Sequence, residues 1–383
     1  MTRPYLKEEH ELFRRSLRRF LEKEAVPSVD RWEREGLIPR SFWLKLGANG
    51  FLAPGVEPKY GGLGADFGYS VVIIEELERV VSGLQGVALH NEIVVPYLQH
   101  EGTEVQKKRW LPSCVTGQTI TAIAMTEPGA GSDLASIRTT AVKDGNHWVI
   151  NGQKTFISNG IHADLVIVAV KTDPHAQPPH RGISLIVVED GTPGFVKGRK
   201  LEKMGLRSQD TAELYFEDCR VPVDHLLGEE GRGFAVLMKH LERERLVLAI
   251  GAQTAAEEML RMTVEYVRRR EAFGRTLDRH QHVRFRLAEL ATEVELGRTF
   301  VDHAVTEFIS GRRLGKKAAM AKWWVTEMAR RLSVECLQLH GGYGYMEEYP
   351  IARRVRDIAV APVYAGTTEI MKELVARELF GND

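Results

Sequence analysis

The first third of the chain places apolar residues at helical spacing. Over residues 7–21 they recur at i, i+4, i+7 and i+8 counted from Phe13, as in an amphipathic helix, and Pro27 closes the segment. Further helical patterns cover residues 41–46, 69–80 and 104–111. Residues 1–118 are therefore expected to form a helical domain.

Short β-branched runs separated by turn residues follow. They cover residues 147–150, 154–158, 165–170, 183–188 and 212–216. Asn151 and Gly152 lie between the first two runs and are a strong hairpin signal. No long helical pattern separates the runs, so the βαβ alternation of a Rossmann sheet is missing. We expect a small antiparallel, barrel-like β-domain over residues 119–229.

The remainder of the chain, residues 230–383, returns to helical periodicity. Its helical patterns cover residues 234–270, 282–309, 316–340 and 367–379. Four consecutive helices predict a four-helix bundle. The first would be roughly 55 Å long, enough to pass from a ligand site to a distant subunit contact. The expected fold is thus mainly α with a β middle domain.

Composition narrows the class of protein without choosing one. A chain of 383 residues is long enough for two or three domains and a large buried cofactor. Lys plus Arg equals Asp plus Glu, at 52 each, so no overall positive field exists to hold nucleic acid. No apolar run approaches the ~20 residues of a membrane span, and no secretory signal pattern opens the chain, so we expect a cytoplasmic protein.

Cysteine and histidine give no sign of a metal site. Cys114, Cys219 and Cys336 are isolated and are interpreted as buried structural thiols. The 13 histidines show no HExxH-like ligand spacing. We therefore expect neither a bound metal nor a disulfide framework.

The first segment that suggests chemistry is residues 124–133, where a strand pattern runs into the loop AMTEPGAGSD. Its glycines let backbone N–H groups approach a phosphate or a flavin edge closely. Taken alone, a loop of Gly, Pro and Ser is more often a plain turn. Its interpretation therefore depends on the longer motifs.

These motifs resemble those of the acyl-CoA dehydrogenase family. In the family's order, the chain carries TEPGAGSD, KTFISNG, KMGLRSQDTAELYFEDCRVP, RREAFG, QLHGGYGY and YAGTTEI. The succession of helical, β and helical regions is also the family's architecture, and the resemblance covers essentially the whole chain. It implies FAD as cofactor and acyl-CoA as substrate. The similarity of residues 346–352 and 369–379 is greatest to long-chain dehydrogenases.

By this resemblance, two groups of residues would hold FAD, the second partly across a subunit boundary. The first group is Ile123, Ala124, Met125, Thr126, Ser132, Phe156, Ile157 and Ser158. The second group is Arg270, Gln281, Gln338, Leu339, His340, Gly341, Gly342, Thr367, Thr368 and Glu369. Many relatives carry Trp at the position of Phe156, so Phe156 would shield the flavin over a smaller area. For Arg270, bidentate binding of the FAD pyrophosphate competes with the ordinary role of an exposed Arg in a basic run.

The substrate-binding positions implied by the resemblance are Ser132, Arg245, Ala365 and Gly366. Removing a proton α to a thioester needs a carboxylate whose pKa is raised toward neutrality. Many family members place that Glu where this chain has Ala365. Taken literally, this departure could mean an inactive protein.

Glu244 is the alternative base. The residues on its helical face are apolar or small: Leu237, Leu241, Leu248, Gly251 and Ala255. Such surroundings raise the pKa of a carboxylate, and Gly251 and Ala255 would leave room for an acyl chain. Long-chain and isovaleryl-CoA dehydrogenases also lack the Glu at the Ala365 site and supply it from an ERL string that matches this position. The competing interpretations are an ordinary ion pair of Glu244 with Arg243, Arg245 or Lys239, or Glu369 as the base.

The expected function is α,β-dehydrogenation of an acyl-CoA to the trans-2-enoyl-CoA, as in fatty-acid β-oxidation. The resemblance further implies a homo-oligomer, expected to be a tetramer, and an electron-transferring flavoprotein as electron acceptor. Two alternatives remain open at this point. One is an acyl-CoA oxidase or a related flavin oxidase, and the other is a non-catalytic FAD or acyl-CoA binding protein.

Overall fold

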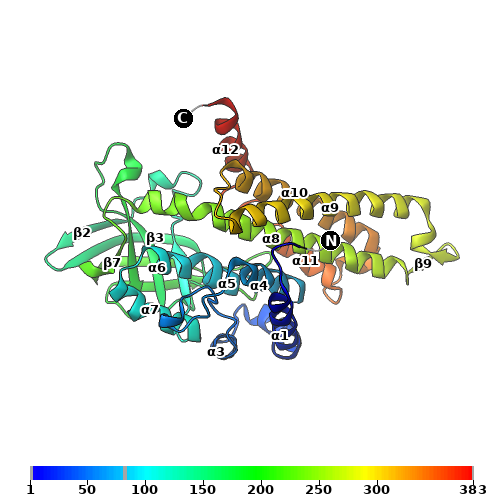
Figure 1. The fold of residues 1–383 in the computed structure, drawn as a ribbon, viewed down its shortest axis with the longest axis horizontal. Coiled ribbons are helices and arrows are strands. Elements are labelled where there is room, and N and C mark those ends of the chain that lie inside the picture. Colours follow the sequence, from blue (N-terminus) through cyan, green and yellow to red (C-terminus); the bar gives the residue numbers. More distant parts are fainter. Residues whose placement is uncertain (1–2, 81–83, 382–383) are drawn as a thin grey trace.

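The computed structural model describes residues 3–80 and 84–381, so the predicted ranges 1–118 and 230–383 lie partly outside the described residues. Three successive regions are visible along the chain (Figure 1). Helices make up the first, a twisted sheet the second, and long helices the third. The sheet lies at one end of the molecule, and the long helices extend away from it.

The first region is helical, as predicted. Its helices are α1 (Glu8–Glu24), α2 (Val29–Glu35), α3 (Arg40–Ala48), α4 (Phe67–Val80), α5 (Gln85–Ala88), the π-helical turn η3 (Leu89–Val94), α6 (Val95–Glu101) and α7 (Glu104–Thr116). The predicted helices correspond to α1, α3, α4 and α7. The prediction for α7 stopped too early, because the helix continues through Pro112 to Thr116. The short helix α2 and the segment from α5 to α6 were not predicted.

The middle region is an eight-stranded sheet. Its strands are β1 (Thr121–Ala124), β2 (Thr140–Asp144), β3 (His147–Ser158), β4 (Leu165–Lys171), β5 (Ile183–Glu189), β6 (Phe195–Lys200), β7 (Thr211–Pro222) and β8 (Leu226–Leu227). Their order is β6-β7-β3-β2-β4-β5-β8, with β1 beside β4. Most pairs are antiparallel, as predicted, but β1 and the end of β2 run parallel to β4.

The predicted hairpin at Asn151 and Gly152 is wrong. Both residues lie inside the continuous strand β3, at a register shift against β7. Gly152 has a φ of 147°, and a Cβ there would lie 2.5 Å from the Thr139 hydroxyl oxygen. The Asn-Gly pair therefore forms a β-bulge where a neighbouring segment approaches closely. The hairpin turn lies earlier, between β2 and β3, at Gly145, which has a φ of 57°.

Strand β4 is buried on both faces of the sheet. Alternate residues of a strand point to opposite faces. Leu165, Ile167 and Ala169 join the hydrophobic cluster that includes residues of α6 and α7. Val166 and Val168 join a second cluster formed within the β region. The helices of the first region therefore hold one face of the sheet.

The third region contains five helices rather than the four predicted. They are α8 (Gly233–Val267), α9 (Gln281–Ile309), α10 (Lys316–His340), α11 (Pro350–Ile358) and α12 (Thr368–Phe380). The small hairpin of β9 (Glu271–Ala272) and β10 (Arg275–Thr276) joins α8 to α9. Helix α11 was missed because its nine residues carry three arginines and one aspartate. Helix α12 projects from the body of the molecule (Figure 1).

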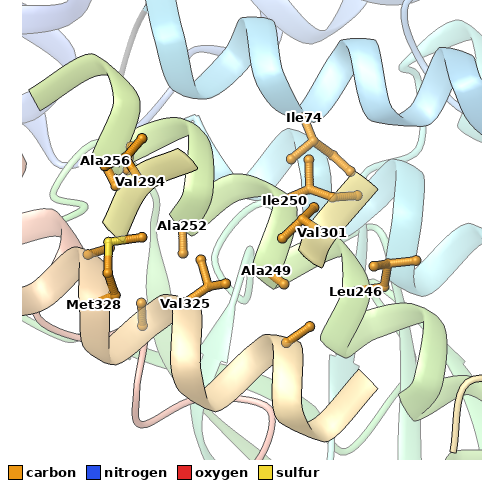
Figure 2. Close-up of a cluster of buried hydrophobic side chains, with 14 of the residues drawn as sticks. Ile74, Leu246, Ala249, Ile250, Ala252, Ala256, Val294, Val301, Val325 and Met328 are labelled. Carbon is orange, nitrogen blue, oxygen red and sulfur yellow. The ribbon is translucent and has the colours of Figure 1, made fainter. Parts of the chain in front are cut away.

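Helix α8 is the central element of this region. Figure 2 shows its residues Leu246, Ala249 and Ile250 between Ile74 of α4, Val301 of α9 and residues of α10. Small residues on α8 allow these helices to approach closely. No helix in the described part of the chain is both long and apolar enough to cross a membrane.

Candidate active site

Glu244 lies on α8 and is only 3 % exposed. Burial raises the pKa of this carboxyl group to about 7, and a hydrogen bond from Tyr97 and the nearby arginines reduce the rise. The Tyr97 hydroxyl donates to Glu244 Oε1 over 2.7 Å. Glu244 is therefore a buried carboxylate that can change its protonation state near neutral pH.

The neighbouring charges on α8 have other partners. Arg243 forms an ion pair with the buried Glu92, and Lys239 pairs with Glu101 over 2.8 Å. Among the ion pairs that join described residues, none involves Glu244 or Arg245. The simple surface ion pair considered for Glu244 is thus absent from the described structure.

Tyr97 is held in place by its own neighbours. It is fully buried, and its ring stacks on His240 with centroids 4.0 Å apart. His240 Nε2 lies 3.0 Å from Glu101 Oε1. Tyr97 follows the π-helical turn η3, which adds a residue to the turn and changes the direction of the side chains after it. Local sequence patterns could not predict the contact of Tyr97 with Glu244, because 147 residues separate the two partners.

A pocket begins one turn beyond Glu244 on the same face of α8. Leu248, Gly251 and Ala255 line it, together with Val247 and Ala252. Tyr364 also lines this pocket. Because Ala365 follows Tyr364 in the chain, the Ala365 turn adjoins this pocket. The small residues singled out in the sequence do leave a cavity.

The turn from Ala365 to Gly366 has an unusual backbone. Ala365 has a φ of 49° and Gly366 a φ of 96°. Left-handed conformations are unfavourable for alanine and tend to occur at functional sites. The buried Lys322 holds this turn by donating to Gly366 O over 2.6 Å and to Pro362 O over 3.1 Å. Burial, and then the charge of Arg245, lower the pKa of Lys322 to about 8.

Glu369 is a poor candidate for the base. It is exposed at the start of α12, whose N-cap is Thr367. Hydrogen bonds from its own backbone N–H and from Thr367 hold the pKa of Glu369 below its usual value. Thr368, next to it, is buried and donates its hydroxyl to Glu327. Of the two candidates, only Glu244 is in surroundings that make a carboxylate more basic.

Phe156 interrupts β3 in a way that suits a flat ligand. It has a φ of 59° and lies at a register shift between β3 and β7, so the strand bulges there. The bulge turns its ring outward, where it is 68 % exposed. The flanking Ile157 is buried and Ser158 half-buried. An exposed aromatic ring beside a half-buried hydroxyl fits the edge of a flavin.

The glycine-rich loop after β1 lies against β3. Thr155 N–H donates to Thr126 O over 3.0 Å, and Lys154 Nζ donates to Met125 O over 3.1 Å. Lys154 also forms a buried ion pair of 2.7 Å with Glu127. Both residues occur in the quoted motifs, but their role in joining the two segments was not predicted.

The loop itself is open to solvent. Gly129, Gly131 and Ser132 are exposed, and a Cβ on either glycine would meet nothing within 4 Å. In contrast, Ile123 and Ala124 are buried within β1. The loop therefore presents the backbone of its glycines and the hydroxyl of Ser132 to a ligand such as FAD, whereas Ile123 and Ala124 offer no exposed side chain.

Most of the remaining predicted FAD contacts lie at the far end of the long helices, whereas Thr367, Thr368 and Glu369 lie at the start of α12, where Thr368 bonds to Glu327 of α10. Arg270, Gln281, Gln338, Gly341 and Gly342 are exposed at that far end. Leu339 is half-buried, and His340 is buried against Tyr266 with ring centroids 4.3 Å apart. Helix α8, roughly 50 Å long for its 35 residues, separates this group from the sheet. The structure therefore does not bring the two predicted cofactor groups together within one chain.

One cluster of possible metal ligands occurs among the described residues. It consists of Glu9, His10 and Asp66, away from Glu244 in the helices of the first region. His10 Nε2 lies 2.9 Å from Asp66 Oδ1, and His10 Nδ1 accepts from the backbone of Lys7. These contacts give the cluster a structural role at the start of α1.

Comparisons with known proteins agree with this architecture. Three family models match in order: the acyl-CoA dehydrogenase N-terminal domain over residues 7–118, the middle domain over 122–219 and the C-terminal domain over 231–380. The chain is 48% identical over 373 residues to the mitochondrial long-chain specific acyl-CoA dehydrogenase of Sus scrofa, covering 97% of this chain and 86% of that protein.

Solved structures show the same similarity. The crystal structure of an acyl-CoA dehydrogenase from Geobacillus kaustophilus superimposes with a TM-score of 0.98 at 64% identity, covering 99% of this chain and 100% of that one. Butyryl-CoA dehydrogenase from Megasphaera elsdenii gives a TM-score of 0.93 at 34% identity, with 98% of each chain covered.

The chain belongs to the acyl-CoA dehydrogenase family. It is an oxidoreductase of the class that acts on CH–CH bonds, and the family depends on FAD.

Proposed function

We propose that this chain is an FAD-dependent acyl-CoA dehydrogenase that forms a trans-2-enoyl-CoA, with Glu244 as the base. The observation that carries this proposal is the buried Glu244 carboxyl, whose pKa is raised to about 7, one helical turn from a pocket with an apolar wall on α8. A base with this pKa is partly ionised at neutral pH, and it is more basic than an exposed carboxylate.

In this proposal, Glu244 removes the α proton of the bound thioester. Tyr97 holds one carboxylate oxygen, Oε1, and leaves Oε2 for the proton. Bound FAD, held by residues that include Phe156 and Ser158, would supply the hydride acceptor for the β hydrogen. The acyl chain occupies the pocket along α8, where it excludes water from Glu244 and keeps its pKa high.

The thioester oxygen gains negative charge as the α proton leaves. We assign its stabilisation to the backbone N–H of Ala365, whose left-handed conformation is fixed by the hydrogen bonds of Lys322. A backbone donor requires no particular side chain. The absence of a carboxylate at Ala365 is therefore compatible with activity.

We further propose a homo-oligomer, a tetramer by analogy with the family, in which two chains complete each FAD site. The two cofactor groups of one chain are separated by the length of α8. Large exposed side chains occur at the far end, including Phe273 at 96 % and Tyr345 at 78 %. Another copy of the chain would cover such residues. We assign the electrons to an electron-transferring flavoprotein as acceptor.

The decisive experiment is anaerobic mixing of FAD-saturated protein with a panel of acyl-CoA thioesters. The proposal predicts bleaching of the flavin absorbance and one equivalent of 2-enoyl-CoA. Absence of bleaching with every thioester from butyryl- to stearoyl-CoA would contradict it. Admitting air afterwards separates a dehydrogenase, which reoxidises slowly, from an oxidase.

A further inference from the structure

The pocket beside Glu244 changes character along its length. Residues Val247 to Ala255 of α8 form its apolar wall and span roughly 12 Å along the helix axis. Gly251 lies in the middle of this wall. A Cβ added at Gly251 would meet only Ile74, at 3.7 Å, so the missing side chain leaves free width.

Polar side chains line the other part of the same pocket. They are Glu78 of α4, Gln85 of α5, and Arg354 and Asp357 of α11, and we call these four residues the polar floor. Glu78, Arg354 and Asp357 are each buried to more than nine-tenths. Two carboxylates and one guanidinium therefore meet where an apolar chain would otherwise continue.

Hydrogen bonds hold the polar floor together. Arg354 Nη1 donates to Glu78 Oε1 over 3.3 Å, and Gln85 Nε2 donates to Glu78 Oε2 over 2.9 Å. Arg354 Nη2 also donates to the carbonyl oxygens of Glu78 and Arg79, over 3.2 and 3.1 Å. Asp357 accepts from the backbone N–H of Leu206 over 2.6 Å. The floor is thus a bonded unit that joins α4 to α11.

An apolar acyl chain gains no binding free energy by contacting the polar floor. Each methylene buried against the apolar wall strengthens binding about four-fold. A methylene placed against Glu78 and Arg354 finds charged groups, and separating them would leave a buried charge unpaired. Affinity should therefore stop rising, and then fall, once the chain reaches the floor.

We propose that the polar floor sets the upper limit of acyl chain length, an inference that rests on the proposed function. From Glu244 to Ala255 the helix rises roughly 16 Å, which is the extended length of a chain of roughly 14 carbons at ~1.2 Å per bond. The preferred substrate class is an acyl-CoA with an uncharged, apolar chain of about this length. Chains that end in a carboxylate are disfavoured, because the floor already holds Glu78 and Asp357.

The test compares kcat/KM across saturated acyl-CoA thioesters of 4 to 20 carbons, using FAD-saturated protein. Replacing both charges, Glu78→Ala with Arg354→Ala, should raise the ratio of C18 to C12 activity about ten-fold or more. Gly251→Leu should lower the ratio of C18 to C12 activity, because the leucine side chain fills the free space beside the apolar wall. Arg353→Ala is the matched control. Arg353 lies next to Arg354 on α11, but it forms an ion pair with Asp30 of α2 and does not line the pocket.

The outcomes separate this inference from the proposed function. If the double variant folds and keeps the wild-type profile, the polar floor does not limit chain length, whatever Gly251→Leu does. If the double variant fails to fold, as judged by thermal melting, Glu78→Gln with Arg354→Gln, which removes both charges and keeps polar side chains of similar shape, decides in its place. Failure of the wild-type protein to reduce flavin with any chain length would instead contradict the proposed function.

Discussion

The burial of Glu244 predicts a specific dependence of stability on pH. In the folded protein the pKa of this group is about 7, against 4.5 for an ordinary glutamate. The folded state therefore favours the protonated form. The stability associated with this group is complete below pH 4.5 and is lost as the pH rises through about 7.

The size of this change in stability follows from the shift in the pKa of Glu244 between the unfolded and the folded protein. A change of about 2.5 pKa units corresponds to at most about 3 kcal/mol between the two limits. Glu244→Gln keeps the shape and can still accept from the Tyr97 hydroxyl, but it does not ionise. The variant should therefore gain stability relative to the wild type between pH 5 and pH 8.

Urea denaturation at pH 5 and at pH 8 measures the difference in unfolding free energy between Glu244→Gln and the wild type at each pH. Glu369→Gln is the control, because Glu369 is exposed and its pKa lies below the usual value. The control should show no such gain at pH 8. If Glu244→Gln differs from the wild type by the same amount at both pH values, Glu244 is not a carboxyl with a raised pKa.

Three further predictions concern the site. Tyr97→Phe removes a hydrogen bond that stabilises the ionised Glu244, so the pH midpoint of flavin reduction should rise by about one unit. The control Tyr60→Phe loses a 2.7 Å hydrogen bond to Glu104, away from the site, and should leave this midpoint unchanged. Arg270→Ala should weaken FAD binding in a titration of the apoprotein more than turnover at saturating FAD; unchanged affinity would refute this role. Adding Ala365→Glu to Glu244→Gly should restore part of the reduction rate, and no rescue would mean that Ala365 cannot present a base to the α carbon.

Periodicity predicted the long elements well, because it records which face of a helix is buried. The α8 pattern around Glu244 indicated both an apolar environment and space at Gly251, and the structure has the buried carboxyl and the pocket. The segment from α5 to α6 was missed, because the polar residues His90, Asn91 and Glu92 interrupt its apolar positions and a π-helical turn leaves it without a single period.

Contacts between distant segments could not be predicted from local pattern. Tyr97 and Glu244 are 147 residues apart, and Glu78 and Arg354 are 276 apart. The Asn151 and Gly152 pair shows the converse limit. The hairpin predicted there is wrong, because a bulge uses the same backbone freedom as a hairpin turn and only the pairing of β3 with β7 distinguishes the two.

The most direct test of the central claim is the rate of flavin reduction in FAD-saturated Glu244→Gln protein, mixed anaerobically with an acyl-CoA that reduces the wild type. Loss of a general base predicts a rate ~10²- to 10⁴-fold lower, with acyl-CoA affinity retained. Reduction at close to the wild-type rate would show that another group removes the α proton.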